Sequence, residues 1–133
     1  MKKITGLCFA LLLLLSSQLC HAQNTPKATK NPGTTAIEAY YFHNAARCVT
    51  CKAVESEAKA DLESLYGKQV SFKALNLEEE STKPIAEKLQ VSGQTLLVVK
   101  GDKKVNLTNE GFMYARTNPA KFKQIIKEKV DNL

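Results

Sequence analysis

The chain has 133 residues, a length that allows one domain, and 44% of them are hydrophobic, enough to build a core. The formal net charge is +6, but the 19 basic residues are interleaved with 13 acidic ones and form neither an arginine-rich arm nor a basic and aromatic stripe. We therefore expect no nucleic-acid partner.

Residues 1–22 have the features of a secretory signal peptide. Two lysines precede an apolar run at residues 9–15, and the expected cleavage point follows Ala22. The apolar run is too short for a membrane anchor, so we expect no stable membrane span after cleavage. Lipidation of Cys20 is the lesser alternative, because bulky Leu19 precedes it where a small residue is expected. The sequence thus predicts a periplasmic or secreted protein.

Cleavage after Ala22 would remove two of the four cysteines. Residues 23–35 are polar and interrupted by Pro and Gly, as in a flexible linker, so the predicted domain is residues 36–133. The two remaining cysteines, Cys48 and Cys51, are three residues apart. Because a loop this short hardly constrains the unfolded chain, a disulfide-stapled scaffold is excluded and the pair indicates chemistry.

Stretches with a strand pattern alternate along the chain with stretches of helical period. Gly67 marks the end of one helix, and Asn118 with Pro119 marks the start of another. A Lys-Gly-Asp-Lys turn predicts a hairpin between the last two strands. The expected elements are a strand at 36–42, a helix from Cys48 to Gly67, a strand at 70–77, a helix at 81–90, a strand at 95–99, a strand that begins with Val105 and Leu107, and a helix from Pro119.

A Cys-x-x-Cys pair stands where the first strand gives way to the first helix. A thiol at the first turn of a helix faces unpaired backbone N–H groups and the positive end of the macrodipole, which favour its thiolate form. The flanking cations Arg47 and Lys52 act in the same direction. The spacing puts both sulfurs on one side of the helix, with Cys48 more exposed and Cys51 turned inward. We therefore predict that Cys48 attacks and Cys51 resolves.

The β-α-β-α-β-β-α order, with this pair at the first strand-to-helix junction, resembles the thioredoxin fold. The resemblance covers residues 35–133 and implies an α/β fold with a four-stranded mixed sheet and helices on both faces. Gln94 stands where that family has a cis-proline, and we expect a trans bond there because a cis bond before another residue costs about 3 kcal/mol. The first strand also lacks the family's buried acid, so proton handling must differ.

A second, local resemblance is to small exported thioredoxin-like proteins named the nitrophenyl-compound nitroreductase subunit family of organoarsenical-resistance operons. It implies an accessory thiol protein that helps to reduce aromatic nitro groups beside an efflux permease. The residues that carry it are Tyr40, Tyr41, Phe42, His43, Arg47, Cys48, Thr50, Cys51, Lys52 and Glu55.

Three side chains near the pair are candidates for supporting roles. His43 could accept a proton in place of the missing acid, or join Cys48 and Cys51 as a third ligand for zinc or copper; the plain alternative is a loop histidine. Arg47 could bind an anionic substrate or lower the pKa of Cys48. Gln94 could bond a thiolate or a substrate amide, or else satisfy backbone groups of its own loop.

The leading hypothesis is an exported thiol–disulfide oxidoreductase or electron carrier that uses Cys48 and Cys51 without a cofactor. Its partner would be a protein disulfide or redox protein in the periplasm, and we expect a monomer. The alternative is a non-enzymatic copper or zinc carrier that uses Cys48, Cys51 and His43. A third hypothesis is an interaction module that kept the fold, in which replacing Cys48 would change nothing.

Overall fold

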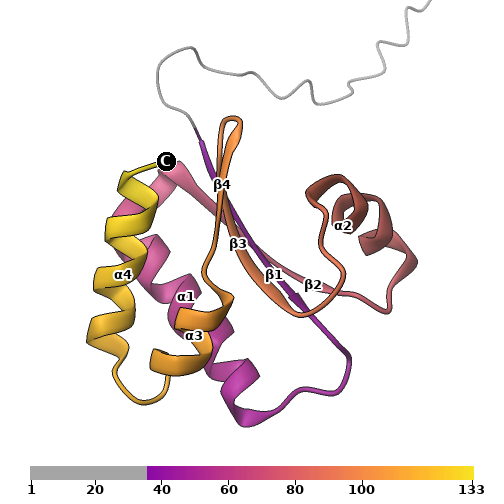
Figure 1. Cartoon of the computed structure of the whole chain (residues 1–133), viewed down its shortest axis with the longest axis horizontal. Helices are drawn as coiled ribbons and strands as arrows, with labels where there is room; N and C mark the ends of the chain where they lie inside the picture. Colours follow the sequence, from indigo (N-terminus) through magenta and orange to yellow (C-terminus); the bar gives the residue numbers. More distant parts are fainter. Residues whose placement is uncertain (1–35) are drawn as a thin grey trace, which may run out of the picture. The chain divides into compact units, whose positions relative to one another are not determined.

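The computed structural model describes residues 36–133, which form a four-stranded sheet with helices on both faces (Figure 1). The strand order is β2-β1-β3-β4. Strand β1 (Ile37–His43) is parallel to β2 (Val70–Asn76) and antiparallel to β3 (Thr95–Lys100), which is antiparallel to β4 (Lys103–Asn106). The predicted α/β, thioredoxin-like fold with a mixed sheet is confirmed.

Two predictions fall on a part of the chain that the structure does not describe. The signal peptide at residues 1–22 and the linker at residues 23–35 both lie outside residues 36–133. Among the helices of residues 36–133, none combines the length and the apolar character that crossing a bilayer requires.

The helices lie in two layers. Helix α1 (Val49–Tyr66) ends at Gly67 as predicted, and α4 (Pro119–Asp131) begins after Asn118, whose side chain caps it. Helices α1 and α4 cover one face of the sheet, and α2 (Lys83–Leu89) lies on the other (Figure 1). Two short 3-10 helices are η1 (Gly67–Gln69) and η2 (Glu80–Thr82).

Strand β1 is the centre of the core because both of its faces are covered. Ala39 and Tyr41 pack into the cluster beneath α1 and α4, while Tyr40 and Phe42 pack into the cluster beneath α2. The predicted first strand is therefore present and is buried on both faces. The strand ends at His43, and a short loop leads from there to the start of α1.

The structure corrects one expectation, the continuation of the fourth strand through Leu107. The chain instead turns into a short helix, α3 (Thr108–Tyr114), which the sequence pattern did not predict. The side chain of Asn106 accepts the Thr108 N–H at 2.9 Å, which turns the chain out of the strand. The Thr108 hydroxyl accepts the Leu96 N–H at 2.9 Å, and this bond ties the start of α3 to β3.

Gly111 is the point at which α3 meets α1. A Cβ at this position would lie 2.8 Å from Cγ1 of Val54 on α1, closer than a carbon contact allows. The Val54 side chain is fully buried, and its branched shape leaves it little freedom to move aside. The absence of a side chain at Gly111 therefore sets how closely α3 approaches α1.

We predict that Gly111→Ala lowers the free energy of unfolding by about 1–3 kcal/mol, because the added methyl overpacks the contact with Val54. Denaturant unfolding of the two proteins measures the difference. Gly93→Ala is the matched control, because a Cβ at Gly93 meets nothing within 4 Å. Equal stability of Gly111→Ala and the natural chain would contradict the close-packing account.

Candidate functional site

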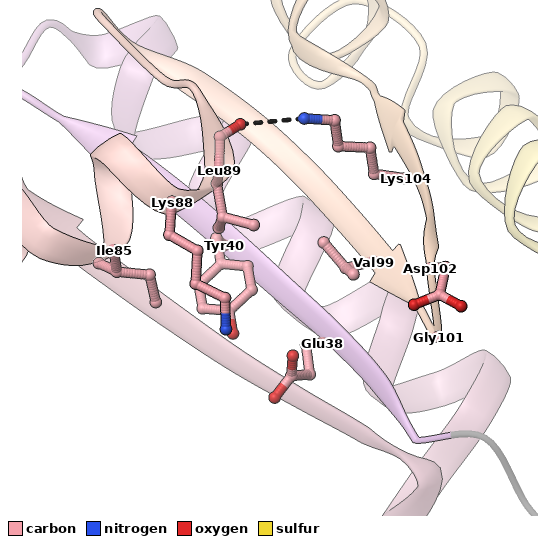
Figure 2. A pocket seen from close by; sticks show the side chains of 9 residues that line it. All are labelled: Glu38, Tyr40, Ile85, Lys88, Leu89, Val99, Gly101, Asp102 and Lys104. Atoms are coloured by element: carbon pink, nitrogen blue, oxygen red, sulfur yellow. Dashed lines mark hydrogen bonds between the residues drawn. The ribbon is translucent and has the colours of Figure 1, made fainter.

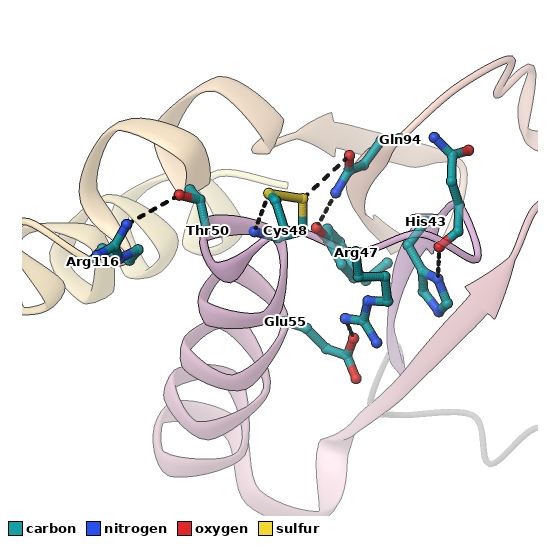
Figure 3. The surroundings of a disulfide bond; sticks show 10 residues. His43, Arg47, Cys48, Thr50, Glu55, Gln94 and Arg116 are labelled. Carbon is teal, nitrogen blue, oxygen red and sulfur yellow. Dashed lines mark hydrogen bonds and ion pairs between the residues drawn. A yellow bond between two sulfur atoms is a disulfide. The ribbon is translucent and has the colours of Figure 1, made fainter.

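Cys48 and Cys51 form a disulfide at the start of α1, with their Cα atoms 5.1 Å apart (Figure 3). Cys48 is the N-cap residue, and its Sγ accepts a hydrogen bond from the Cys51 backbone N–H at 3.1 Å. The first turn of α1 contains no acidic residue. A negative charge at Cys48 would therefore meet the positive end of the helix and one aligned donor, which favours a thiolate there after reduction.

The two sulfur-bearing residues differ in exposure. Cys48 is exposed and the next residue, Val49, is 70% exposed, whereas Cys51 is only 6% exposed. This agrees with the arrangement expected from the spacing. A reactant from solvent can reach Cys48, while Cys51 lies against the core.

The loop between β1 and α1 is fastened at two points. The Ala45 N–H donates to a carboxylate oxygen of Glu78 at 2.9 Å. Arg47 forms an ion pair with Glu55 of α1, and its guanidinium carbon lies 5.9 Å from the centre of the Tyr41 ring. Arg47 thus holds the loop to α1 through a paired charge, and its predicted action on Cys48 or on a substrate remains a prediction.

Gln94 lies beside the disulfide, in the loop before β3 (Figure 3). Its Nε2 donates to the hydroxyl of Tyr41, and its Oε1 is 3.8 Å from Sγ of Cys51. The peptide bonds of residues 36–133 are all trans, as predicted for the bond before Gln94. Burial raises the pKa of Tyr41 above its ordinary value, so its side chain is a neutral hydroxyl at physiological pH. The buried sulfur therefore faces a neutral, anchored amide.

The side chain of His43 does not approach the disulfide. Its Nδ1 lies 2.9 Å from the carbonyl oxygen of Asn44, and the imidazole points away from the disulfide (Figure 3). Within residues 36–133, no three His, Cys, Asp or Glu side chains come together in a group that could hold a metal. The structure does not bring His43 to Cys48 and Cys51 as the metal alternative requires, and its part in proton transfer remains a prediction.

Two exposed cations border the pair. Lys52, predicted from its position beside the motif, follows Cys51 with its side chain exposed. Arg116, which follows α3, places Nη1 3.5 Å from the Thr50 hydroxyl (Figure 3). The start of α1 around Cys48 therefore carries positively charged side chains.

Three residues of this site were missed by the sequence analysis. The hydroxyl of Tyr41 could have been suspected, because a buried tyrosine needs a hydrogen-bond partner. No local signal indicates Glu78 or Arg116, because tertiary contacts alone bring them to Ala45 and Thr50.

A pocket described by the structure lies away from the disulfide. This pocket lies on the α2 side of the sheet, where charged side chains such as Glu38 and Lys88 surround Tyr40 (Figure 2). Lys104 crosses its edge and donates to the carbonyl oxygen of Leu89 at 3.1 Å. This pocket contains neither cysteine, whereas Cys48 is exposed at the start of α1.

No family model matches this chain, and no curated protein matches it significantly. The germline-specific thioredoxin Deadhead from Drosophila melanogaster is similar over 71% of this chain and 81% of its own, with 16% sequence identity and a TM-score of 0.46. The solved structure of a malarial protein is similar over 52% of this chain and 74% of its own, with 21% identity and a TM-score of 0.40. At these values neither likeness informs the chemistry of the site, which rests on the chain's own geometry.

We predict that limiting iodoacetamide labels Cys48 of the reduced protein at least about tenfold faster than Cys51 at mildly acidic pH, because Cys48 is exposed and caps the helix. Peptide mass spectrometry after short reaction times measures the ratio. The same reaction in denaturant is the control, where the two rates should converge. Equal labelling in the folded protein would contradict the proposed asymmetry.

Proposed function

We propose that this chain is a thiol–disulfide oxidoreductase or electron carrier whose working group is the Cys48–Cys51 pair. One observation carries the proposal: an exposed sulfur that caps the start of α1 is bonded to a buried sulfur three residues later. This arrangement separates the sulfur that reacts with partners from the sulfur that closes the ring.

The exchange proceeds in two steps. A partner thiolate attacks Sγ of Cys48, the Cys48–Cys51 bond breaks, and its electron pair passes to Cys51, which takes a proton from water. A second partner thiolate then attacks the partner's own sulfur in the mixed disulfide and releases Cys48. The partner's two thiols become a disulfide, and the chain gains two electrons as two thiols. In the reverse direction Cys48 attacks a partner disulfide and Cys51 resolves the intermediate.

The exposed apolar side chains support a protein partner. Among residues 36–133, the exposed large hydrophobic residues are Val49 beside Cys48 and Phe112 and Met113 on α3. Helix α3 packs on the first half of α1 through Gly111. We propose that these three side chains and the exposed cations Lys52 and Arg116 make up one docking surface, which we call the α3 surface. A partner segment that is apolar and acidic around its cysteine complements this surface.

The compartment and the wider system are further parts of the proposal. The basic and apolar start of residues 1–22 supports export to the periplasm, where thiol pairs are oxidised and exchanged. The local resemblance around Cys48 supports a role beside the reduction of aromatic nitro groups in an arsenical-resistance system. Both parts rest on sequence, and the thiol chemistry does not depend on either.

We predict that reduced Cys51→Ser protein, mixed with oxidised glutathione, stops as a stable mixed disulfide at Cys48 and releases one glutathione thiol. The natural chain should release two thiols and close its own disulfide, and Cys48→Ser should react at least about a hundredfold more slowly than the natural chain. Intact mass and free-thiol assays measure these outcomes. A metal assay on the same samples tests the alternative of a metal carrier. Stoichiometric copper or zinc that blocks both thiols would favour that carrier over the redox proposal. Equal reaction of all three proteins would support the interaction module.

We predict that Met113→Glu lowers severalfold the rate of exchange with a disulfide peptide of apolar and acidic sequence, relative to the rate with neutral hydroxyethyl disulfide. The added carboxylate repels the acidic peptide at the α3 surface. Gln124→Glu, which adds the same charge on the exposed side of α4, is the matched control. An unchanged ratio in Met113→Glu would show that partners do not dock on this surface.

A further inference from the structure

The buried sulfur of Cys51 has a specific polar neighbour. Gln94 presents its Oε1 to this sulfur at 3.8 Å, and its Nε2 donates to the fully buried Tyr41 hydroxyl (Figure 3). The three residues come from α1, the loop before β3 and β1, so their meeting is a property of the fold.

Reduced Cys51 needs a hydrogen-bond acceptor beside it as a thiol and a hydrogen-bond donor as a thiolate. A thiol donates a hydrogen bond, whereas a thiolate accepts one, and a buried thiolate without a donor is costly. When a partner attacks Cys48, Cys51 leaves as a thiolate. The nearby backbone N–H of Cys51 is already directed to Cys48, at 3.1 Å. Gln94 is therefore the side chain of the described residues placed to serve the leaving sulfur.

We propose that the Gln94 amide, anchored by Tyr41, binds Cys51 in both forms by rotating half a turn. With a thiol at Cys51, Oε1 accepts the S–H and Nε2 donates to Tyr41, as the present arrangement allows. With a thiolate, Nε2 donates to the sulfur and the Tyr41 hydroxyl donates to Oε1. A hydroxyl serves both arrangements because it is donor and acceptor. This inference rests on the proposed function.

The step leaves the amide chemically unchanged. The electron pair of the broken bond goes to Cys51, and the proton that later neutralises it comes from water, so neither Gln94 nor Tyr41 gains or loses a proton. The charged groups beside Tyr41 are Arg47 and Glu55, which pair with each other and act in opposite directions on the hydroxyl. Gln94 touches the reacting sulfur, whereas Tyr41 is a positioning residue that acts through Gln94.

The test measures the rate at which dithiothreitol reduces the disulfide of the full mature protein. Gln94→Met keeps the length of the side chain but removes its donor, and Tyr41→Phe keeps the ring but removes the anchor. Each should slow the reduction about tenfold, as expected for loss of a hydrogen bond to a developing charge. The double variant should be no slower than Gln94→Met, because Tyr41 acts through the amide.

Tyr40→Phe is the matched control. It is the same tyrosine-to-phenylalanine change as Tyr41→Phe, but Tyr40 lies on the opposite face of β1, in the cluster beneath α2. It should reduce at the natural rate. If Tyr41→Phe does not fold, Gln94→Glu replaces it, since a carboxylate keeps the shape and the acceptor but repels the leaving thiolate. That variant should be slower than Gln94→Met.

Natural rates in Gln94→Met and Tyr41→Phe, or fully multiplying effects in the double variant, would overturn the inference. If Tyr41→Phe is unfolded, reduction of both Gln94→Met and Gln94→Glu by dithiothreitol at the rate of the natural chain would overturn the inference. Failure of the proposed function is distinguishable, because the natural chain itself would then not exchange its disulfide with dithiothreitol.

Discussion

The hydrogen bond from the Cys51 backbone N–H to Sγ of Cys48 is the contact on which the chemistry of this chain depends. It exists because strand β1, buried on both faces, ends at His43, and the short loop that follows brings Cys48 to the N-cap position of α1. Two contacts fasten the loop between them: the Ala45 N–H donates to Glu78, and Arg47 pairs with Glu55. The fold therefore fixes one sulfur over the positive end of a helix.

The same short stretch gives the two sulfurs different surroundings. Cys48 meets solvent and the helix end, which suit a nucleophile. Cys51 meets the core and the neutral Gln94 amide, which suit a sulfur that alternates between bonded and reduced forms. An amide that rotates can serve either a thiol or a thiolate at Cys51 without carrying a charge itself.

The parts of the fold that could be predicted from sequence are those with local signals. Gly67 and Asn118 mark helix ends by their own conformational and hydrogen-bonding preferences, and the cysteine spacing indicates which sulfur is buried. Helix α3 could not be predicted, because glycine has a low helix propensity and Gly111 therefore argues against a helix. The reason for a glycine there, the close packing of α3 against Val54 of α1, is visible only in the structure. Arg116 was missed with this helix, since this cation follows α3 and reaches Thr50, which lies between the two cysteines in the sequence.

The central claim is that Cys48 and Cys51 are a reversible dithiol and disulfide pair. Its most direct test is to equilibrate the protein against glutathione buffers and to count the free thiols of Cys48 and Cys51, with metal content measured in the same samples. The account predicts one two-electron transition in which both thiols disappear together as the disulfide forms, in metal-free protein. Thiols that stay free across oxidising buffers, or that are held by stoichiometric copper or zinc, would contradict it.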